Sequence, residues 1–386
     1  MTKPLAPTVA VIGGGQLARM MAEPAAALGI PLRLLAEAEG VSAAQVICDQ
    51  QVGDYRDLDT LRQVTEGCTA VTFDHEHVPT EHLKALANAG LAVRPGPSAL
   101  VHAQDKGVMR AKLAELGVPC PRNAIVTSLA DVEAFGFPAV LKTTRGGYDG
   151  KGVWVVREPA DCAEAFAAAE AAAVEVLAEE LVDFRRELSA LVARSPSGQA
   201  AAYPVVASTQ LDGICHEVIA PAPDLDRDLA VQAQEVALTI AGALDVTGVL
   251  AVELFETNDG RILVNELAMR PHNTGHWTQD GAVTSQFENH LRAVLDLPLG
   301  SPAPRATWTV MVNILGGDTD AGRLYDGYPH AMARDPQLRV HLYGKEMRPG
   351  RKVGHVNTYG DDLDDCLERA RHAAAWFRGD LGNESE

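Results

Sequence analysis

The stretch that most constrains how this chain folds is TGVLAVELFETNDGRILVNELAMR, residues 247–270. Two apolar runs rich in β-branched residues flank Asp259-Gly260, a dipeptide favoured in two-residue hairpin turns. The stretch therefore predicts an antiparallel hairpin. With Asp259 and Gly260 as its loop, Glu253 lies directly opposite Glu266, at about 5 Å between Cβ atoms, where like charges repel each other.

These two carboxylates also interrupt strands that are otherwise apolar, where an unpaired buried charge is costly. A divalent cation resolves both problems. Together with the amide oxygen of Asn265, Glu253 and Glu266 form a set of hard oxygen ligands that suits Mg²⁺, with phosphates completing its shell. The alternative is a hairpin face exposed to solvent, and a loop one residue longer would misalign the pair.

The first third of the chain alternates short apolar runs with helix-like or turn-like stretches, which predicts β-α-β units and a parallel sheet. The expected strands are 9–13, 31–36, 46–48, 69–73 and 91–94. PGPS at 95–98 marks a boundary, and an amphipathic helix is expected over 99–116. Later segments predict antiparallel strands, helices at 226–244 and 362–377, and an α+β organisation.

A glycine-rich loop follows the first expected strand in VAVIGGGQLARMM, residues 9–21. Gly13, Gly15 and Ala18 fit the G-x-G-x-x-G/A pattern, which lets a phosphate approach the first amides of a helix. Glu37 stands at about the distance expected for an acid that binds the ribose of a dinucleotide. A dinucleotide, another phosphate and no ligand at all therefore stay open for this loop.

A second candidate phosphate site begins at Lys142, which ends the apolar run PAVLK and precedes the glycine-rich TTRGGYDGKG. A lysine beside a glycine loop is suited to holding phosphates, and the loop amides add further donors. The next strand ends in AEELV, residues 178–182, whose backbone suits an adenine edge, and Glu187 suits ribose hydroxyls. A surface hairpin with solvated carboxylates is the alternative.

Length and charge limit the classes of function. The chain has 386 residues, which predicts two to four domains. Its net charge of −19 disfavours nucleic acid and anionic membranes as partners. No apolar run reaches the length of a membrane span, and six scattered cysteines without a C-x-x-C pair indicate a reducing cytoplasm. Against this acidic background, the basic cluster at 345–352 is notable.

The order of these motifs resembles the ATP-grasp superfamily, whose members activate a carboxylate or bicarbonate as an acyl phosphate. The segments RPHNTGHWTQDGAVTSQFENHLRAVLDLPL (270–299) and YGKEMRPGRKVGHVN (343–357), with GGGQLARM and RGGYDGKG, narrow the resemblance to the 5-(carboxyamino)imidazole ribonucleotide synthase family of purine biosynthesis. It covers essentially the whole chain.

This resemblance implies an α/β and α+β architecture: the ATP-grasp fold with an N-terminal Rossmann-like parallel-sheet domain and a small C-terminal domain. The expected N-terminal domain is 1–105. The lid and catalytic subdomains of the ATP-grasp fold are expected at 106–180 and 181–298, and the C-terminal domain at 299–386.

The implied reaction is the ATP-dependent carboxylation of 5-aminoimidazole ribonucleotide with bicarbonate, through carboxyphosphate, by a cytoplasmic homodimer. It uses ATP and Mg²⁺, with Mn²⁺ as an alternative ion. Another ATP-grasp ligase or transformylase acting on a purine precursor, and a nicotinamide-dependent oxidoreductase, are the alternative functions.

The resemblance also implies roles for individual residues, with Glu253 and Glu266 as metal ligands. The expected ATP contacts are Lys106, Lys142, Gly147, Gly150, Glu179, Glu180, Leu181, Val182, Glu187, Asn265 and Glu266. The expected substrate contacts are Gly15, Gln16, Leu17, Glu76, Tyr148, Asn273, Lys345, Arg348 and Arg351. Catalytic roles are expected for Asp149, Arg270, His276 and Lys352.

Asp149 is expected to orient or deprotonate the substrate amine, and Arg270 to hold bicarbonate. The loop at 146–152 is the expected lid, because carboxyphosphate hydrolyses readily and water must be excluded. The sequence departs from the family at Lys106, where relatives usually carry arginine, and at His75 and His77 in DHEHVP. A lysine at position 106 keeps the charge but loses the planar fork of donors.

Overall fold

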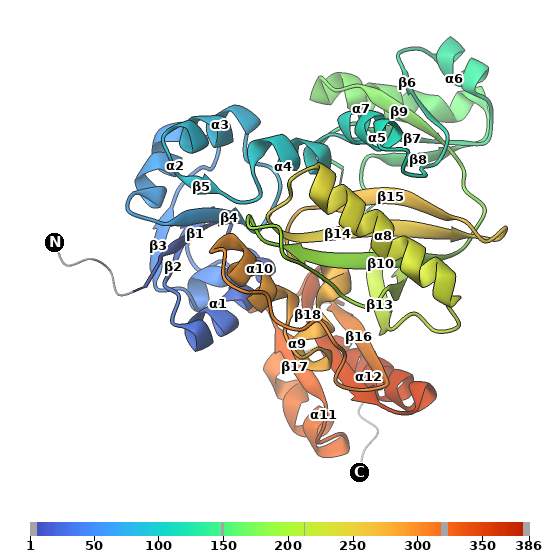
Figure 1. The fold of residues 1–386 in the computed structure, drawn as a ribbon. Helices are drawn as coiled ribbons and strands as arrows, with labels where there is room; N and C mark the ends of the chain where they lie inside the picture. Colours follow the sequence, from blue (N-terminus) through green and yellow to red (C-terminus); the bar gives the residue numbers. More distant parts are fainter. Residues whose placement is uncertain (1–5, 148–149, 212, 318–322, 381–386) are drawn as a thin grey trace.

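The computed structural model describes residues 6–147, 150–211, 213–317 and 323–380. Within these ranges the strands form three sheets (Figure 1). Their arrangement agrees with the expected α/β and α+β architecture. No helix in the described ranges combines the length and apolar character that crossing a membrane requires.

The N-terminal sheet is parallel throughout, in the order β3-β2-β1-β4-β5. Its strands are β1 (Val9–Ile12), β2 (Leu32–Ala36), β3 (Asp49–Val52), β4 (Ala70–Phe73) and β5 (Ala92–Val93). The expected strand at 46–48 is wrong, because Ile47 is buried beside a 3-10 turn while the strand that follows is polar and lies at the sheet edge.

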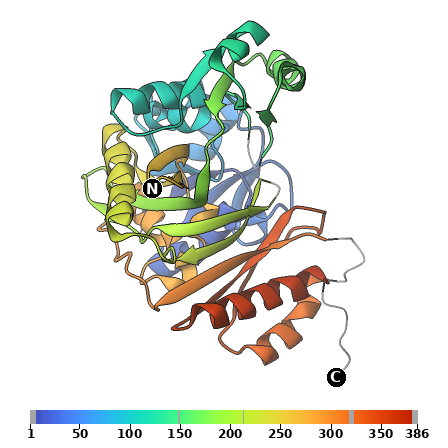
Figure 2. The ribbon, with the colours of Figure 1, turned by 90° about the vertical axis from the view of Figure 1, so that its right-hand side faces the viewer.

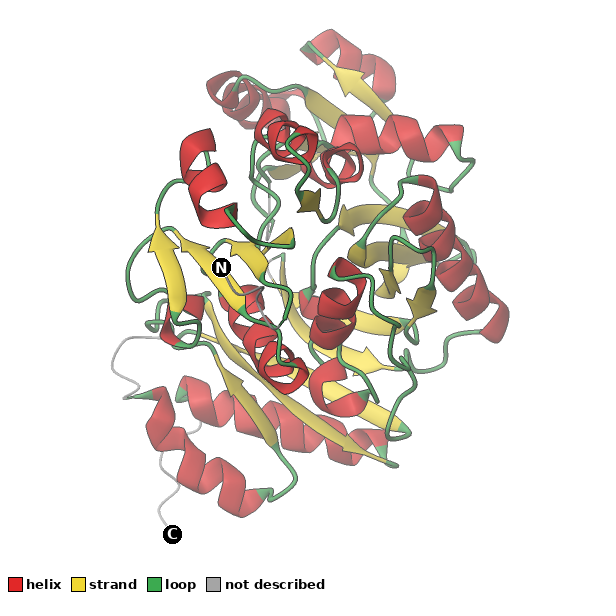
Figure 3. Ribbon diagram, turned by 60° about the vertical axis from the view of Figure 1, so that its left-hand side comes forward, coloured by secondary structure: helices red, strands yellow, loops and turns green. Residues whose placement is uncertain are grey.

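Helices cover both faces of this sheet, as its uniformly buried first strand requires (Figure 3). They are α1 (Gln16–Leu28), α2 (Leu58–Thr65), α3 (Thr80–Asn88) and, from far along the chain, α10 (Gln286–Val294). Side chains of α10 share a core cluster with those of α1. The first domain is thereby joined directly to the catalytic part of the molecule.

The helix expected over 99–116 is two helices, α4 (Pro97–Gln104) and α5 (Lys106–Glu115). They are separated at Asp105, whose backbone is extended and whose carboxylate accepts a hydrogen bond from the amide of Val108 at 3.1 Å. Asp105 is thus the N-cap of α5. The interruption puts Lys106 in the first turn of α5, beside the cavity described below.

The lid sheet is antiparallel, in the order β6-β9-β7-β8. Its strands are β6 (Asn123–Val126), β7 (Ala139–Thr143), β8 (Val153–Val156) and β9 (Val176–Glu180), and its helices are α6 (Leu129–Phe135) and α7 (Ala163–Ala172). It has a small core of its own. Lys142 on β7 and Glu179 on β9 therefore lie on neighbouring strands of one sheet.

The central sheet continues from the catalytic region into the C-terminal domain, in the order β15-β14-β10-β12-β13-β16-β18-β17. The catalytic strands are β10 (Phe184–Arg194), β12 (Val206–Leu211), β13 (Ile214–Ala220), β14 (Gly248–Thr257) and β15 (Ile262–Ala268), and β11 (Ala200–Ala202) pairs with β10. The C-terminal strands are β16 (Trp308–Leu315), β17 (Arg339–Leu342) and β18 (Lys352–Gly360). Helix α8 (Arg227–Ala243) packs on the catalytic strands, and α12 (Leu363–Arg378) packs along β16 and β18 (Figure 2).

The expected hairpin is present as β14 and β15, and Glu253 pairs with Glu266 as predicted. The reason differs from the one expected. The loop has three residues, Asn258 to Gly260, because the amide of Thr257 donates to the carbonyl of Arg261 at 2.9 Å. The longer loop alone would shift the register.

A β-bulge corrects this shift. Leu254 pairs with Val264, whereas Glu253 pairs with Glu266, so that Asn265 is the extra residue without a partner in β14. Toward the loop the strands follow the register of the longer turn, and beyond the bulge they follow the predicted one. The extra residue, Asn265, therefore sets the register in which the two glutamates face each other.

Candidate active site

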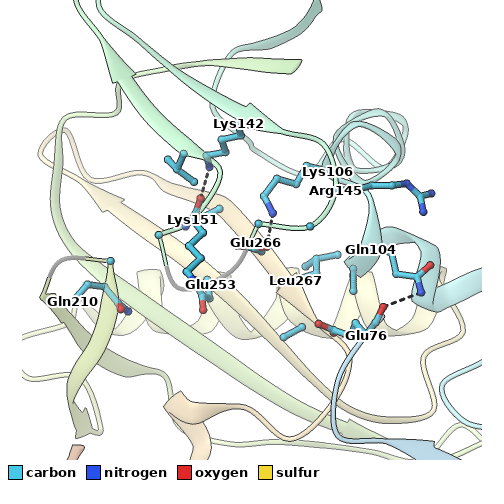
Figure 4. A pocket seen from close by; sticks show the side chains of 18 of the residues that line it. Glu76, Gln104, Lys106, Lys142, Arg145, Lys151, Gln210, Glu253, Glu266 and Leu267 are labelled. Atoms are coloured by element: carbon cyan, nitrogen blue, oxygen red, sulfur yellow. Dashed lines mark hydrogen bonds and ion pairs between the residues drawn. The ribbon is translucent and has the colours of Figure 1, made fainter. Parts of the chain in front are cut away.

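A cavity of about 700 Å³ lies where the lid sheet, the β14–β15 hairpin and the end of the N-terminal sheet meet (Figure 4). The structure gathers most of the predicted site residues around it. The predicted residues that line it are Glu76, Lys106, Lys142, Gly147, Gly150, Glu179, Glu180, Leu181, Val182, Glu187, Glu253, Asn265, Glu266, Arg270, Asn273 and Lys352.

The glutamate pair lines this cavity, and each carboxylate has a basic side chain beside it. The Lys106 ammonium donates to Glu266 Oε1 at 2.8 Å, and His272 Nε2 lies 3.2 Å from Glu253 Oε1. Burial disfavours the charge of Glu253, but the hydrogen bond and charge of His272 hold its pKa below the ordinary value. Both carboxylates are partly open to the cavity, where a cation would meet them.

Lys142 reaches into the cavity from the opposite side, from β7 of the lid sheet (Figure 4). Its ammonium lies 2.7 Å from Glu179 Oε2 and donates to Asn265 Oδ1 at 3.1 Å. Burial disfavours the charge of Glu179, but the charges of Arg110 and Lys142 outweigh it and lower its pKa. Lys142 is thus a positive charge held in a fixed place beside the glutamate pair.

The hinge between β9 and β10 forms the wall on the other side of Lys142. Leu181 and Val182 lie in this hinge and line the cavity, and Phe184 beyond it stacks on Phe255 with ring centroids 4.8 Å apart. Burial and the charge of Glu253 raise the pKa of Glu187 to about 7. Apolar surface, hinge backbone and a carboxyl group are therefore combined at the place predicted for adenine and ribose.

The glycine loop before α1 binds protein carboxylates. The amide of Gly14 donates to Glu37 at 2.9 Å, and those of Gly15 and Ala18 donate to Asp74 at 3.1 and 2.8 Å. A Cβ at Gly15 would lie 2.2 Å from Asp74 Oδ2, so glycine is required for this approach. The amide of Gly15, predicted to contact substrate, is thus already used, and Glu37 is engaged rather than open to a dinucleotide ribose.

The next two amides of α1, those of Gln16 and Leu17, have no hydrogen-bond acceptor among the described residues. The Gln16 side chain accepts from the Lys345 ammonium, which brings the basic C-terminal segment to this helix end. Arg348 and Arg351 are exposed, and Arg348 pairs with Glu346 at 2.8 Å. Of the predicted basic cluster, Lys345 adjoins α1 and Lys352 lines the cavity.

A third group of predicted residues lies between the hinge side of the cavity and the start of α1. Glu76 Oε1 accepts from the amide of Met269 at 2.5 Å, and its Oε2 lies 3.4 Å from Arg270 Nε. Asn273 lines the cavity, and its side-chain amide has no hydrogen-bond partner among the described residues. The Arg270 side chain is thus partly open at this part of the cavity, whereas the polar atoms of Asn273 are buried behind its surface.

His276 is not brought into the cavity. Its side chain is fully buried, its Nδ1 lies 3.0 Å from Gln286 Nε2, and its ring packs beside His355. Burial lowers the pKa of His276 well below its ordinary value. The expected contact between His276 and the reacting groups therefore has no support in the geometry. Tyr148 and Asp149, the other lid predictions, lie outside the described residues.

Several cavity residues were missed by the sequence analysis. Arg145 and Lys151 lie in a motif that was interpreted through its glycines, and His272 lies in the RPHN motif, where no role was predicted for it. Arg110, which lies behind the lining, occupies a helix position where an arginine ordinarily faces solvent. Gln104 contributes by donating to the carbonyls of Glu76 and Val78, both at 2.9 Å.

Comparisons with known families match three consecutive parts of the chain. Residues 6–104 match the ribonucleotide synthetase preATP-grasp domain, residues 111–287 the ATP-grasp domain, and residues 309–369 the phosphoribosylaminoimidazole carboxylase C-terminal domain.

Related proteins match over nearly the full length. The N5-carboxyaminoimidazole ribonucleotide synthase of Mycobacterium tuberculosis is 54% identical over 382 residues, which cover 98% of this chain and 89% of that protein. The enzyme of the same name from Corynebacterium ammoniagenes is 51% identical, with 95% of this chain and 91% of that protein covered. The name denotes the 5-(carboxyamino)imidazole ribonucleotide synthase family that the motifs resemble.

Solved structures agree in fold. An ADP complex of N5-carboxyaminoimidazole ribonucleotide synthetase has a TM-score of 0.88 at 36% identity, covering 99% of this chain and 100% of the other. The Aspergillus clavatus synthase in complex with ADP and 5-aminoimidazole ribonucleotide has a TM-score of 0.88 at 30% identity, covering 96% and 98%. Sequence, domain order and fold thus agree, and the chain belongs to the N5-carboxyaminoimidazole ribonucleotide synthase family of ATP-grasp ligases.

Proposed function

We propose that this chain carboxylates 5-aminoimidazole ribonucleotide with bicarbonate and ATP, releasing ADP and phosphate. The observation that carries this proposal is the facing pair Glu253 and Glu266 beneath Lys142, in a chain of this family. Two carboxylates and a fixed cation around one cavity suit the handling of a nucleotide triphosphate tail.

At the nucleotide end, the lid sheet and the hinge supply the contacts. The hinge backbone at Glu179–Val182 borders the adenine, and Glu187 accepts from the ribose hydroxyls. Lys142 and Lys106 neutralise phosphate oxygens, and the lid amides at Gly147 and Gly150 cover the phosphates. Binding of the triphosphate requires Lys106 to exchange its carboxylate partner for a phosphate.

Glu253 and Glu266 fit a magnesium ion by the chemistry of their donors and by their register. With Asn265 Oδ1 they offer three hard oxygens, too few for an octahedral shell, so the shell is completed by phosphates and water. These residues would hold the ion, Mg²⁺ or Mn²⁺, which would supply charge neutralisation for the transferred phosphoryl group. Lys142 would balance further phosphate charge.

At the substrate end, the ribose phosphate lies against the amides of Gln16 and Leu17, which have no acceptor in the described part of the chain, with Lys345 beside Gln16. For Arg348 and Arg351 to contact the ribose phosphate, the exposed segment that carries them has to move. Glu76, Arg270 and Asn273 border the aminoimidazole and the bicarbonate between the two ends, and Lys352 lies on the same wall.

The chemistry takes two steps. An oxygen of bicarbonate, held by Arg270, attacks the γ-phosphorus of ATP, the bond to the bridging oxygen of ADP breaks, and carboxyphosphate forms. The amine nitrogen of the substrate then attacks the carboxyl carbon, the bond to phosphate breaks, and the amine loses a proton. Asp149 is the proposed acceptor of this proton, and Tyr148 a further contact of the lid. Closure of the lid excludes water from the intermediate.

The wider setting is part of the same proposal: a cytoplasmic homodimer acting on small molecules, with neither nucleic acid nor membrane as a partner. Its acidic surface, with a net charge of −19, is consistent with that setting.

The test measures ADP release with ATP, Mg²⁺ and bicarbonate, with and without 5-aminoimidazole ribonucleotide. Fast release that needs both bicarbonate and the ribonucleotide supports the proposal. Release that needs formate would indicate a transformylase instead, and the absence of release with the full mixture would overturn the assignment.

A further inference from the structure

Arg110 lies on α5, behind the cavity wall, and its side chain is only 2% exposed. Its guanidinium joins two separate parts of the site. Nε donates to Glu179 Oε1 at 2.5 Å, and Nη2 donates to the backbone carbonyl of Asn265 at 2.7 Å. A buried arginine with two acceptors on different sheets is a connection between those sheets.

The two groups that Arg110 holds are the two that hold Lys142. Glu179 offers its other oxygen to the Lys142 ammonium at 2.7 Å, and the Asn265 side chain accepts from the same ammonium at 3.1 Å. Arg110, Glu179, Lys142 and Asn265 therefore form a closed ring of contacts. Within this ring the carboxylate of Glu179 is shared between two cations, which keeps its pKa low despite burial.

The same arginine supports the β-bulge. Asn265 is the residue left without a partner in β14, and a bulged residue leaves backbone groups that need other partners. Its carbonyl finds this partner in Arg110. Because the next residue is Glu266, the contact bears on the orientation of the glutamate pair as well as on that of Lys142.

We propose that Arg110 is a positioning residue for the nucleotide site, fixing Lys142 through Glu179 and the Glu253–Glu266 register through the carbonyl of Asn265. This rests on the proposed function, since it assumes that Lys142 and the glutamates act on the triphosphate and its metal. Arginine suits the task because its planar fork reaches two acceptors at once, whereas the compact ammonium of lysine does not.

The experiment compares the affinity for ATP and the Michaelis constants for ATP and 5-aminoimidazole ribonucleotide in Arg110→Met, Arg110→Lys and wild-type protein. Supporting residues of this kind typically change affinity or activity by about 10- to 100-fold. We expect Arg110→Met to bind ATP at least about ten-fold more weakly and Arg110→Lys to recover part of the loss. The Michaelis constant for the ribonucleotide stays unchanged, because the ring lies at the nucleotide end.

Arg371→Met is the matched control. Arg371 on α12 binds the buried Glu217 through two nitrogens, at 2.6 and 2.8 Å, in the C-terminal domain. Its loss leaves a buried glutamate without its arginine, as Arg110→Met does, although the Arg371 side chain is itself 57% exposed. Among the described residues its hydrogen bonds and ion pair go to Glu217, which does not line the cavity. Arg371→Met therefore lowers stability while leaving ATP affinity unchanged.

If both arginine-to-methionine variants lower stability and neither changes ATP affinity, Arg110 is merely structural and the inference is wrong. If Arg110→Met does not fold, the ATP affinity of Arg110→Lys tests the proposal, because this variant keeps the positive charge. A wild-type ATP affinity in Arg110→Lys overturns the proposal. A wild-type protein that binds no ATP would contradict the proposed function instead, so the two failures are distinguishable.

Discussion

Replacing Glu187 with glutamine is expected to stabilise the ligand-free protein above neutral pH and to change little in acid. Burial, together with the charge of Glu253, raises the pKa of Glu187 from 4.5 to about 7. The folded protein therefore holds this proton more tightly than the unfolded chain does. Between these two values the free energy of unfolding falls as pH rises, and above about pH 7 the whole cost is present.

The magnitude follows from the same numbers. A pKa that rises from 4.5 to about 7 corresponds to about 3 kcal/mol at high pH. Because Glu187 partly faces the open cavity, solvent screening reduces this cost to about 2 kcal/mol. Glutamine carries no charge at either pH, so Glu187→Gln removes the cost at pH 8.5 and mimics the protonated acid at pH 4.5.

The assay is denaturant unfolding of the ligand-free wild-type and variant proteins across this pH range, followed by tryptophan fluorescence. The control is Glu164→Gln on α7, an exposed glutamate outside the cavity lining, whose substitution should not raise stability at pH 8.5 because a carboxylate in the first turn of a helix is favourable. A Glu187→Gln protein with the same stability difference from wild type at pH 4.5 and pH 8.5 would refute the reasoning.

Other substitutions test other parts of the site. Glu266→Gln should abolish ATP turnover that depends on the aminoimidazole ribonucleotide while circular dichroism shows an intact fold; turnover at the wild-type rate would refute the metal assignment. Lys352→Ala should raise the Michaelis constant for the ribonucleotide about ten-fold with little change for ATP, and an unchanged constant argues against its role. Lys106→Gln should tighten Mn²⁺ binding without nucleotide, measured by electron paramagnetic resonance, because Lys106 then no longer competes at 2.8 Å for Glu266; weaker binding contradicts this. Gly15→Ala should destabilise the protein by about 2 kcal/mol in thermal unfolding, because its Cβ would meet the carboxylate that caps α1, and an unchanged midpoint would contradict the clash.

Much of the fold was predictable because its local patterns agree with its tertiary environment. The buried parallel strands are nearly continuous apolar runs, and α8 and α12 follow clear helical patterns close to their observed bounds. The expected strand at 46–48 is wrong because the strand begins later, at Asp49, and as an edge strand it needs no apolar side chains. The prediction failed again at Asp105, whose role as an N-cap is hidden when the surrounding helical pattern is continuous.

For the site, the prediction succeeded where a chemical pattern is local and failed where tertiary contacts decide. The facing glutamates and Lys142 were visible because polar groups interrupt apolar strands. The β-bulge was not predicted, because no local pattern marks Asn265 as the extra residue, and its contact with Arg110 comes from another part of the chain. His276 resembled a catalytic histidine by motif, yet burial among other rings decides its environment.

The bulge at Asn265 also divides the β14–β15 hairpin into two parts with different registers. Only the pairs between the bulge and the tip at 258–260 follow the register of the three-residue turn, whereas the pairs beyond the bulge are offset from it by one residue. The alignment of the acidic pair thus results from the turn and the bulge together, and not from the turn alone.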